Sequence, residues 1–554
     1  MKQTFMKLPS GRDARNQLLI LLSGIFFFVP FLGNVHLFDW DEINFAEASR
    51  EMMVSGNYLQ VQIDYKPFWE KPPLFFWLQT LSMHVFGINE FSARLINAVC
   101  GILTLLIVYR IGRTLFDATM GLLWALAFLG SFLPHFFFKS GIIDPVFNLL
   151  IFSGIYFLAC TLQATESKKK LMRYLFSGVC IGLAVLAKGP VAFLILTLCA
   201  CGYMACTRCK TRMSLREILA LLGAVSVVSG LWYGLETLWH GPWFITEFIK
   251  YQIRLLTTGD AGHGRPFYFH FVILLFGCFP ASFLAIRSFF NANNGTTRQR
   301  DFTRWMIVLF WVVLVLFSIV KTKTVLYSSL CYFPITYLAA FHLHSVIKGK
   351  LGWNKAQTYA LAAFGGLVAL IIAAFPVAMM HKEMITPLIK DTFAVACLQR
   401  PIHWSYGEVL IGAAYGAVLT VSTGLLFRKK FTASFAAIFL ASALCLQLFM
   451  LDMAPKMEAI AGGGPIEFYK SLRGGDCYAH SLFRSYADLF YSQKMPGGNP
   501  KGSDSDWLLN GPIDKPAYLV CRIDKAHDYR GKYGLHEIKD EYGFVYFRRD
   551  AVAK

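Results

Sequence analysis

The sequence predicts a polytopic α-helical membrane protein that ends in a small soluble α/β domain. Hydrophobic residues make up 56 % of the 554 residues and charged residues only 16 %, against roughly 25 % charged residues in a typical soluble chain. The apolar residues gather in runs of about 20, the length that spans a bilayer. The short gaps between these runs are alternately rich in Lys and Arg. Together these observations exclude a soluble, disordered or fibrous protein.

Thirteen apolar runs are candidates for membrane-spanning helices. They lie near residues 17–36, 92–112, 117–135, 143–163, 174–187, 190–206, 217–239, 269–289, 305–320, 325–346, 357–379, 407–427 and 434–452. The fifth and sixth runs are short and share the hinge Ala187-Lys188-Gly189-Pro190. A single long kinked segment is the alternative there, and it would lower the count.

Lys and Arg residues predict how the chain is oriented in the membrane. The N-terminal segment 2–15 is basic, and every second gap after it is short and basic, as in 168–173, 208–216 and 428–430. Short basic gaps face the cytoplasm. We therefore expect the N-terminus inside and the C-terminus outside. The same clusters account for the net charge of +19, so no nucleic-acid partner is needed to explain it.

The domain division follows from a change in composition. We expect a membrane domain over residues 1–452, with a long outside loop at 37–91, and a soluble domain over 453–554. Strand-like runs at 517–523 and 543–548 make the soluble domain α/β.

Cys477 and Cys521 lie in the predicted soluble domain. In an oxidising compartment they could form a disulfide, and two free thiols are the alternative.

The first outside loop contains a predicted amphipathic helix. Asp41 and Glu42 suit its N-terminus, where the helix dipole favours carboxylates and tends to lower their pKa. Its apolar face is formed by Phe45, Ala46, Ser49, Met52 and Met53. A helix lying on the membrane surface with solvated charges is the simplest interpretation.

A second cluster in the same loop combines charges with rigid backbone. Glu70 and Lys71 stand between aromatic residues and Pro72-Pro73, before another amphipathic helix that runs to about Phe86. Two such helices in one outside loop predict the wall of a cavity at the bilayer surface.

Further charged residues lie at the outer ends of predicted spans. Asp144 precedes Pro145, Lys188 lies in the hinge, and Lys321 and Lys323 follow the ninth run. Ionisable residues at such places are usually functional. The alternatives are a helix cap for Asp144 and snorkelling for the lysines.

The second large outside loop, residues 240–268, adds two polar side chains. His263 and Arg265 stand among glycines that let backbone approach a ligand closely.

These motifs occur in one order that resembles a known family. The order is Asp41-Glu42-x-x-x-Ala46-Glu47-x-x-Arg50-Glu51-Met52, Glu70-Lys71-Pro72, Asp144-Pro145, Lys188-Gly189, His263-x-Arg265-Pro266-Phe267 and Lys321-x-Lys323-x-x-x-Tyr327. It is similar to the bacterial aminoarabinose transferases of lipid A and their relatives, in the protein O-mannosyltransferase-like group of GT-C membrane glycosyltransferases. The resemblance covers roughly residues 15–345. The chain departs from the aminoarabinose transferases at Asn44 and Phe45, where those enzymes usually carry Arg-Tyr.

The resemblance implies a GT-C fold and an inverting glycosyltransferase of the bacterial inner membrane. Its donor would be a polyprenyl-phosphate-linked sugar, used at the periplasmic face, and its acceptor lipid A, a protein or another glycan. A polytopic transporter or flippase is the alternative function.

The resemblance and the chemistry together suggest a role for each charged residue. A hydroxyl acceptor needs a general base, for which Asp41 is the first candidate and Asp144 the second. The departing lipid phosphate needs cations, supplied by Lys71 and Arg265. The full set of expected substrate-binding residues is Glu42, Lys71, Lys188, Arg265, Lys323 and Tyr327. Glu70 and His263 could ligate a divalent metal such as zinc, although two ligands far apart in sequence are weak support.

Overall fold

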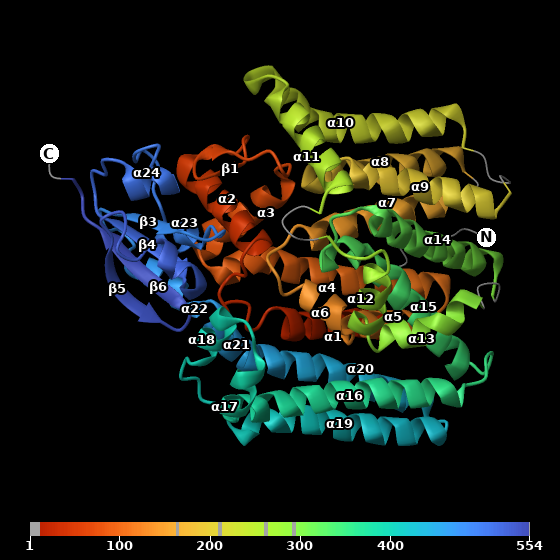
Figure 1. Cartoon of the computed structure of the whole chain (residues 1–554). Coiled ribbons are helices and arrows are strands. Elements are labelled where there is room, and N and C mark those ends of the chain that lie inside the picture. The colour runs from red at the N-terminus through yellow and green to blue at the C-terminus, as the bar shows by residue number, and fades with distance from the viewer. Residues whose placement is uncertain (1–10, 162–165, 209–212, 260–263, 291–294, 553–554) are drawn as a thin grey trace.

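The computed structural model describes residues 11–161, 166–208, 213–259, 264–290 and 295–552. A bundle of roughly parallel and antiparallel helices forms most of the molecule, and a small sheet domain lies against one end of it (Figure 1). The first described residues lie near the opposite end of the bundle. The helices of the bundle and its connections are α1 (Gly11–Phe28), α4 (Glu90–Leu115), α5 (Ala118–Leu129), α6 (Phe132–Phe137), α7 (Asp144–Thr161), α8 (Ser167–Lys188), α9 (Val191–Cys206), α10 (Leu215–His240), α11 (Trp243–Thr257), α12 (Phe269–Gly277), α13 (Ala281–Phe290), α14 (Thr297–Ile319), η2 (Val325–Cys331), α15 (Tyr332–Ile347), α16 (Lys355–Met380), α17 (Lys382–Ile385), η3 (Thr386–Leu388), α18 (Thr392–Leu398), α19 (Tyr406–Phe427) and α20 (Phe431–Leu448).

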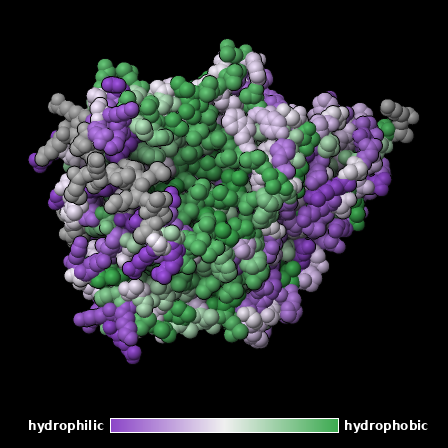
Figure 2. All heavy atoms as spheres, turned by 180° about the vertical axis from the view of Figure 1, so that it is seen from behind, coloured by the Kyte–Doolittle hydropathy of each residue, from purple (hydrophilic) through white to green (hydrophobic). Residues whose placement is uncertain are grey.

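A hydrophobic belt crosses the middle of one face of the bundle (Figure 2). Figure 2 shows apolar side chains covering the central part of one face, with hydrophilic residues at both ends. By length and composition, nine helices of the described residues can cross a membrane, or ten if the bent pair α12 and α13 is one span. The chain is therefore a multi-pass membrane protein.

The predicted count of thirteen spans is higher than this, although a helix lies within each of the thirteen predicted runs. Three predicted runs are not among the ten possible spans, because their helices are too short or carry too many charges. Helices α5 and α9 are apolar but have only 12 and 16 residues. Helix α1 has 18 residues and carries charges at Arg12, Asp13 and Arg15.

The hinge between the fifth and sixth runs separates two helices. Gly189 ends α8 with a φ of 98°, a conformation that favours glycine. Pro190 then precedes the first turn of α9. The alternative of one long kinked segment is therefore wrong.

The first outside loop folds into α2 (Asp41–Ser55), a short hairpin of β1 (Gln62–Ile63) and β2 (Lys66–Pro67), and α3 (Leu74–Phe86). Both predicted helices are present. The surface position predicted for α2 is wrong, however, because its charged residues Glu42, Glu47, Arg50 and Glu51 are as buried as its apolar face.

The C-terminal sheet domain contributes to that burial, because it packs against α2. Its sheet has the order β3-β4-β6-β5, in which β3 and β4 are parallel and the other neighbours antiparallel. The strands are β3 (Tyr478–Ser481), β4 (Ala517–Arg522), β5 (His536–Glu541) and β6 (Phe544–Arg549), and the helical elements are α22 (Gly463–Ser471), α23 (Ala487–Ser492), α24 (Ser505–Asn510) and η5 (Ile523–Asp528). The α/β prediction is thereby confirmed.

One hydrophobic cluster joins the sheet domain to the first outside loop. Leu37, Ile43 and Ala46 pack in it with Tyr491 and Phe544, among other residues. The boundary predicted at 452/453 lies inside a helical stretch, since α20 continues through η4 (Phe449–Met453) into α21 (Ala454–Ala461). Cys477 and Cys521 are free thiols.

Candidate active site

A cavity of about 1010 Å³ lies where the helical bundle meets the sheet domain. Its walls come from the start of α2, the connection from β2 to α3, the ends of α7, α8 and α9 that face the sheet domain, helix α11, the connection from α14 to η2, and the segment after β3. Charged residues from distant parts of the sequence therefore line the same cavity. The charged lining residues are Asp39, Asp41, Glu42, Glu70, Lys71, Asp144, Lys188 and Arg484.

Asp144 and Lys188 form an ion pair at the base of this cavity. The Lys188 Nζ donates to Asp144 Oδ1 at 2.6 Å. Asp144 is the first residue of α7, Lys188 is the last residue of α8, and these two helices pack against each other. Gly189 permits this arrangement, because a Cβ there would lie 2.4 Å from the Phe248 ring. The pair leaves Asp144 already engaged with a cation.

Asp41 lines the same cavity and begins α2. It is exposed to the cavity, although protein surrounds it. Burial raises the pKa of Asp41, Lys71 and Lys188 lower it, and Asp144 and Glu70 raise it, with a net increase above 3.8. The lowering expected from the helix dipole alone is therefore wrong for Asp41, because removal of solvent outweighs it.

The backbone just before Asp41 is strained. Trp40 has a φ of 76° and a ψ of −110°, and such a conformation costs a non-glycine residue about 1–3 kcal/mol. Its carbonyl still accepts the N–H of Asn44 at 2.9 Å, which closes the first turn of α2. Strain of this kind gathers at functional sites.

Lys71 and Lys188 each lie over an aromatic ring of the cavity wall. Lys71 Nζ is 5.0 Å from the centre of the Tyr251 ring, and Lys188 Nζ is 5.3 Å from that of Tyr327. Two ammonium groups thus line the cavity that also contains Asp41.

Glu42 belongs to the framework of the site. Its carboxylate pairs with the buried Arg94 at 2.7 Å and also accepts the backbone N–H groups of Phe38 and Gly141. Arg94 in turn donates to carbonyls of residues 32, 35 and 36. This network fixes the start of α2, so we assign Glu42 a positioning role in place of direct contact with substrate.

Two expected substrate-binding residues lie away from the cavity lining. Lys323 is buried and donates to the Val320 carbonyl at 2.6 Å. Arg265 is exposed, next to a bridge between Gly264 and Thr322. Neither residue lines the cavity.

The metal site stays a prediction. Glu70 lines the cavity, and His263 lies outside the described residues. The part of the chain that the structure describes has no group of three or more His, Cys, Asp or Glu arranged to hold a metal. We therefore assign no step to a divalent ion such as zinc.

The sheet domain contributes residues that the sequence analysis missed. The segment 480–486 after β3 places His480, Arg484, Ser485 and Tyr486 in the cavity wall. Helix α11 likewise adds Tyr251. The Arg-Ser-Tyr sequence directly after a strand could have suggested a functional loop, but nothing in the sequence shows which way the domain faces.

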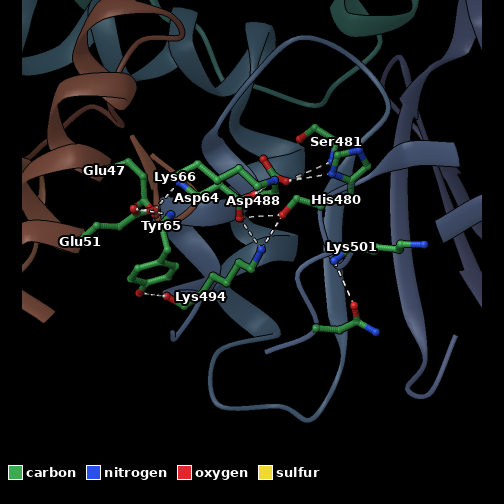
Figure 3. A network of polar contacts seen from close by, with 12 residues as sticks. Glu47, Glu51, Asp64, Tyr65, Lys66, His480, Ser481, Asp488, Lys494 and Lys501 are labelled. Atoms are coloured by element: carbon green, nitrogen blue, oxygen red, sulfur yellow. Dashed lines mark hydrogen bonds and ion pairs between the residues drawn. The ribbon is translucent and has the colours of Figure 1, made fainter. Parts of the chain in front are cut away.

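A polar network fastens the sheet domain to the first outside loop (Figure 3). Lys494 pairs with Asp64 in the β1–β2 turn, and Ser503 donates to the same carboxylate at 2.8 Å. The Lys494 carbonyl accepts hydrogen bonds from Tyr65 and Arg50, each at 2.8 Å. Because the turn connects α2 to the segment of Lys71, the network holds two sides of the cavity together.

Beneath this network, two buried glutamates approach each other. Arg50 binds Glu47 through two hydrogen bonds of 2.7 Å. Glu51 accepts the backbone N–H groups of Asp64 and Tyr65, also at 2.7 Å. Burial and the neighbouring Glu47 raise the pKa of Glu51 well above its ordinary value.

One side of the cavity is apolar. Leu194 and Ile195 of α9, Leu255 and Leu256 of α11, and Leu316 and Phe317 of α14 line it. These three helices belong to the helical bundle and its connections. The cavity therefore combines a charged region with an apolar wall, which suits a ligand with a polar head and a hydrocarbon tail.

Comparisons with known proteins agree with this architecture. Residues 70–233 match the family described as dolichyl-phosphate-mannose-protein mannosyltransferase. The crystal structure of ArnT from Cupriavidus metallidurans bound to undecaprenyl phosphate superposes with a TM-score of 0.77 at 17 % identity, covering 97 % of this chain and 99 % of that one. The chain thus has the fold of the GT-C membrane glycosyltransferases, with a cavity between its helical bundle and its sheet domain.

Within that class, the chain is similar to the undecaprenyl phosphate-α-4-amino-4-deoxy-L-arabinose arabinosyl transferases. It is 24 % identical over 393 residues to that of Pectobacterium carotovorum, a match that covers 67 % of each chain. It is 27 % identical over 365 residues to that of Edwardsiella ictaluri, covering 65 % of each. The resemblance derived from the ordered motifs is confirmed, and the matches span about two thirds of these relatives' length.

Proposed function

We propose that the protein is an inverting glycosyltransferase that moves a sugar from a polyprenyl-phosphate donor to an acceptor at the periplasmic membrane face. The observation that carries this proposal is the cavity with Asp41, Lys71 and Lys188 in its lining and an apolar wall made by α9, α11 and α14. The polyprenyl chain would lie against that wall, and the phosphate would face the lysines. The relatives named above are transferases with undecaprenyl-phosphate donors by name, which favours this function over a transporter or flippase.

The chemistry follows from the positions of these groups. The acceptor oxygen attacks the anomeric carbon, the bond from that carbon to the donor phosphate oxygen breaks, and the lipid phosphate leaves with the electron pair. Asp41 takes the proton of an acceptor hydroxyl as the new bond forms. Lys71 and Lys188 stabilise the negative charge that the leaving phosphate gains. One displacement inverts the configuration of the anomeric carbon.

Asp144 has a different role in this scheme. Its ion pair with Lys188 holds that lysine toward the cavity and leaves the aspartate poorly placed to accept a proton. We therefore keep Asp41 as the general base and make Asp144 its orienting partner. The Tyr327 ring makes a cation–π contact with the Lys188 ammonium and so helps to hold it in place.

The location follows from the charge pattern. We place the protein in the bacterial inner membrane with the N-terminus in the cytoplasm and the sheet domain in the periplasm. Two features support this: the alternating basic gaps of the sequence, and the position of the sheet domain at the end of the bundle opposite to the first described residues (Figure 1).

The acceptor can be found by comparing cells with and without the gene. Mass spectrometry of lipid A and of glycoproteins should show one sugar-sized mass increase that depends on the gene and is lost with Asp41→Asn. Unchanged lipid A, glycoproteins and other envelope glycans would contradict a transferase.

A further inference from the structure

The segment after β3 holds the two residues that precede the candidate base. Arg484 lies with its guanidinium carbon 4.2 Å from the centre of the Trp40 ring. The neighbouring Ser485 donates a hydrogen bond to the Asp39 carboxylate. Two consecutive residues of the sheet domain thus contact two consecutive residues of the first outside loop, directly before Asp41.

These contacts fall on the most strained part of that loop. Trp40 has its positive φ of 76° at the position before the first residue of α2. The first turn of the helix depends on the same segment, because Ile43 N–H donates to the Phe38 carbonyl at 3.2 Å and Asn44 N–H to the Trp40 carbonyl at 2.9 Å. A strained conformation persists only where its surroundings hold it. The Arg484 stack and the Ser485 hydrogen bond are two such restraints.

Arg484 is well suited to this task. Its planar guanidinium can stack on an indole, and within the described residues no carboxylate forms an ion pair with it. Further along the same domain, Lys494 joins it to the first outside loop through Asp64 and Tyr65 (Figure 3).

We propose that Arg484 is a positioning residue that acts through Trp40 to hold Asp41 in its reactive orientation, so that docking of the sheet domain completes the active site. The effect of Arg484 on catalysis rests on the proposed transferase function. The positioning itself is a structural property that can be measured without substrate.

The first measurement is hydrogen–deuterium exchange over residues 38–45 in the purified full-length protein. Arg484→Ala should speed exchange of the Ile43 and Asn44 amides, roughly 3- to 30-fold, because the stack that steadies them is lost. Arg522→Ala is the matched control. Arg522 of the sheet domain lies over Phe393 of α18 at 3.9 Å, a contact of the same kind that joins the sheet domain to a different outside segment and lies outside the cavity lining. Unchanged exchange in Arg484→Ala, or an equal increase in Arg522→Ala, would overturn the proposal.

The second measurement separates positioning from direct binding of substrate. If Arg484 acts through Trp40, Arg484→Ala should lower kcat roughly 3- to 30-fold and leave KM within about twofold. It should add no further loss in a Trp40→Leu background. An arginine that binds substrate would raise KM and give additive losses, and that result would refute the positioning role.

A conservative variant guards against misfolding. Arg484→Lys keeps a cation over the ring and should recover part of both the slow exchange and kcat. If Arg484→Ala changes exchange as expected while the wild type transfers no sugar, the proposed function fails and the positioning contact stands. If the wild type transfers sugar and Arg484→Ala alters neither exchange nor kcat, only the positioning role fails.

Discussion

The environment of Asp41 decides how its carboxylate can act. Its pKa is raised by burial, and Asp144 and Glu70 add to the increase while Lys71 and Lys188 oppose it. A carboxylate with a raised pKa is a stronger base than a free aspartate. The balance between two acids and two lysines is therefore part of the proposed catalysis.

The raised pKa predicts the pH dependence of transfer. Asp41 must be deprotonated to act as a base, so kcat/KM should fall as pH drops through its raised pKa, with a midpoint above 3.8. Asp144→Asn removes a negative charge that raises the pKa of Asp41, and the midpoint should move to lower pH. A pH profile of both proteins checks this, and a midpoint at or below the ordinary aspartate value would contradict it.

Lys71 should strongly stabilise the negative charge that the leaving lipid phosphate gains during transfer. Lys71→Ala should reduce transfer by about 10²–10³-fold, as the loss of one charge-stabilising donor does elsewhere, and Lys71→Arg should retain part of the activity. Lys250→Ala is the control, since Lys250 is exposed and pairs only with Glu247 among the described residues. Full activity in purified Lys71→Ala would show that another cation faces the phosphate.

At the level of elements, α2 and the β1–β2 hairpin form one unit. Glu51 joins them by accepting two backbone N–H groups of the turn. The positive φ values of Asp64 and Tyr65 mark a tight turn that needs this support. The unit carries Asp41 at its start and leads to Lys71 at its end.

Glu51 should make this unit sensitive to pH. Its pKa is higher in the folded protein than in the unfolded chain, so folding binds a proton and stability falls as pH rises above the ordinary glutamate range. Glu51→Gln cannot ionise, so its melting temperature should fall less between pH 5 and pH 8 than that of the wild type. Glu247→Gln, at an exposed site, should follow the wild type. Parallel melting curves for Glu51→Gln and wild type would contradict the raised pKa.

The sequence predicts single elements better than their surroundings. Apolar runs, the amphipathic pattern of the first outside loop and the Gly189-Pro190 hinge located the helices, because these features act over a few residues. The burial of Arg50 could not be predicted, since its guanidinium donates to the Lys494 carbonyl, in a domain more than 400 residues further along the chain. The same distance concealed Arg484, whereas Asp144 and Lys188 were identified by their charge at the ends of apolar runs.

At the level of the whole molecule, the hydrophobic belt in Figure 2 separates two polar ends. The cavity lies at the end that carries the sheet domain. The orientation of the chain therefore decides on which side of the membrane transfer takes place.

Fusions to alkaline phosphatase test that orientation. A fusion after residue 460 should be active, because alkaline phosphatase folds only outside the cytoplasm, and a fusion after residue 170 should be inactive. The reverse pattern would put the cavity on the cytoplasmic side and contradict a periplasmic reaction.

The most direct test of the central claim is sugar transfer by purified protein of verified fold, with a polyprenyl-phosphate sugar as donor. The wild type should release polyprenyl phosphate and form an inverted product. Asp41→Asn keeps the shape of the side chain and should bind the donor normally, but should transfer about 10²–10⁴-fold more slowly, as expected for loss of a general base. An acceptor that is already an ionised phosphate would make this loss smaller, because it has no proton to give up. Transfer at the wild-type rate by Asp41→Asn, together with an inactive Asp144→Asn, would show that the other carboxylate is the base.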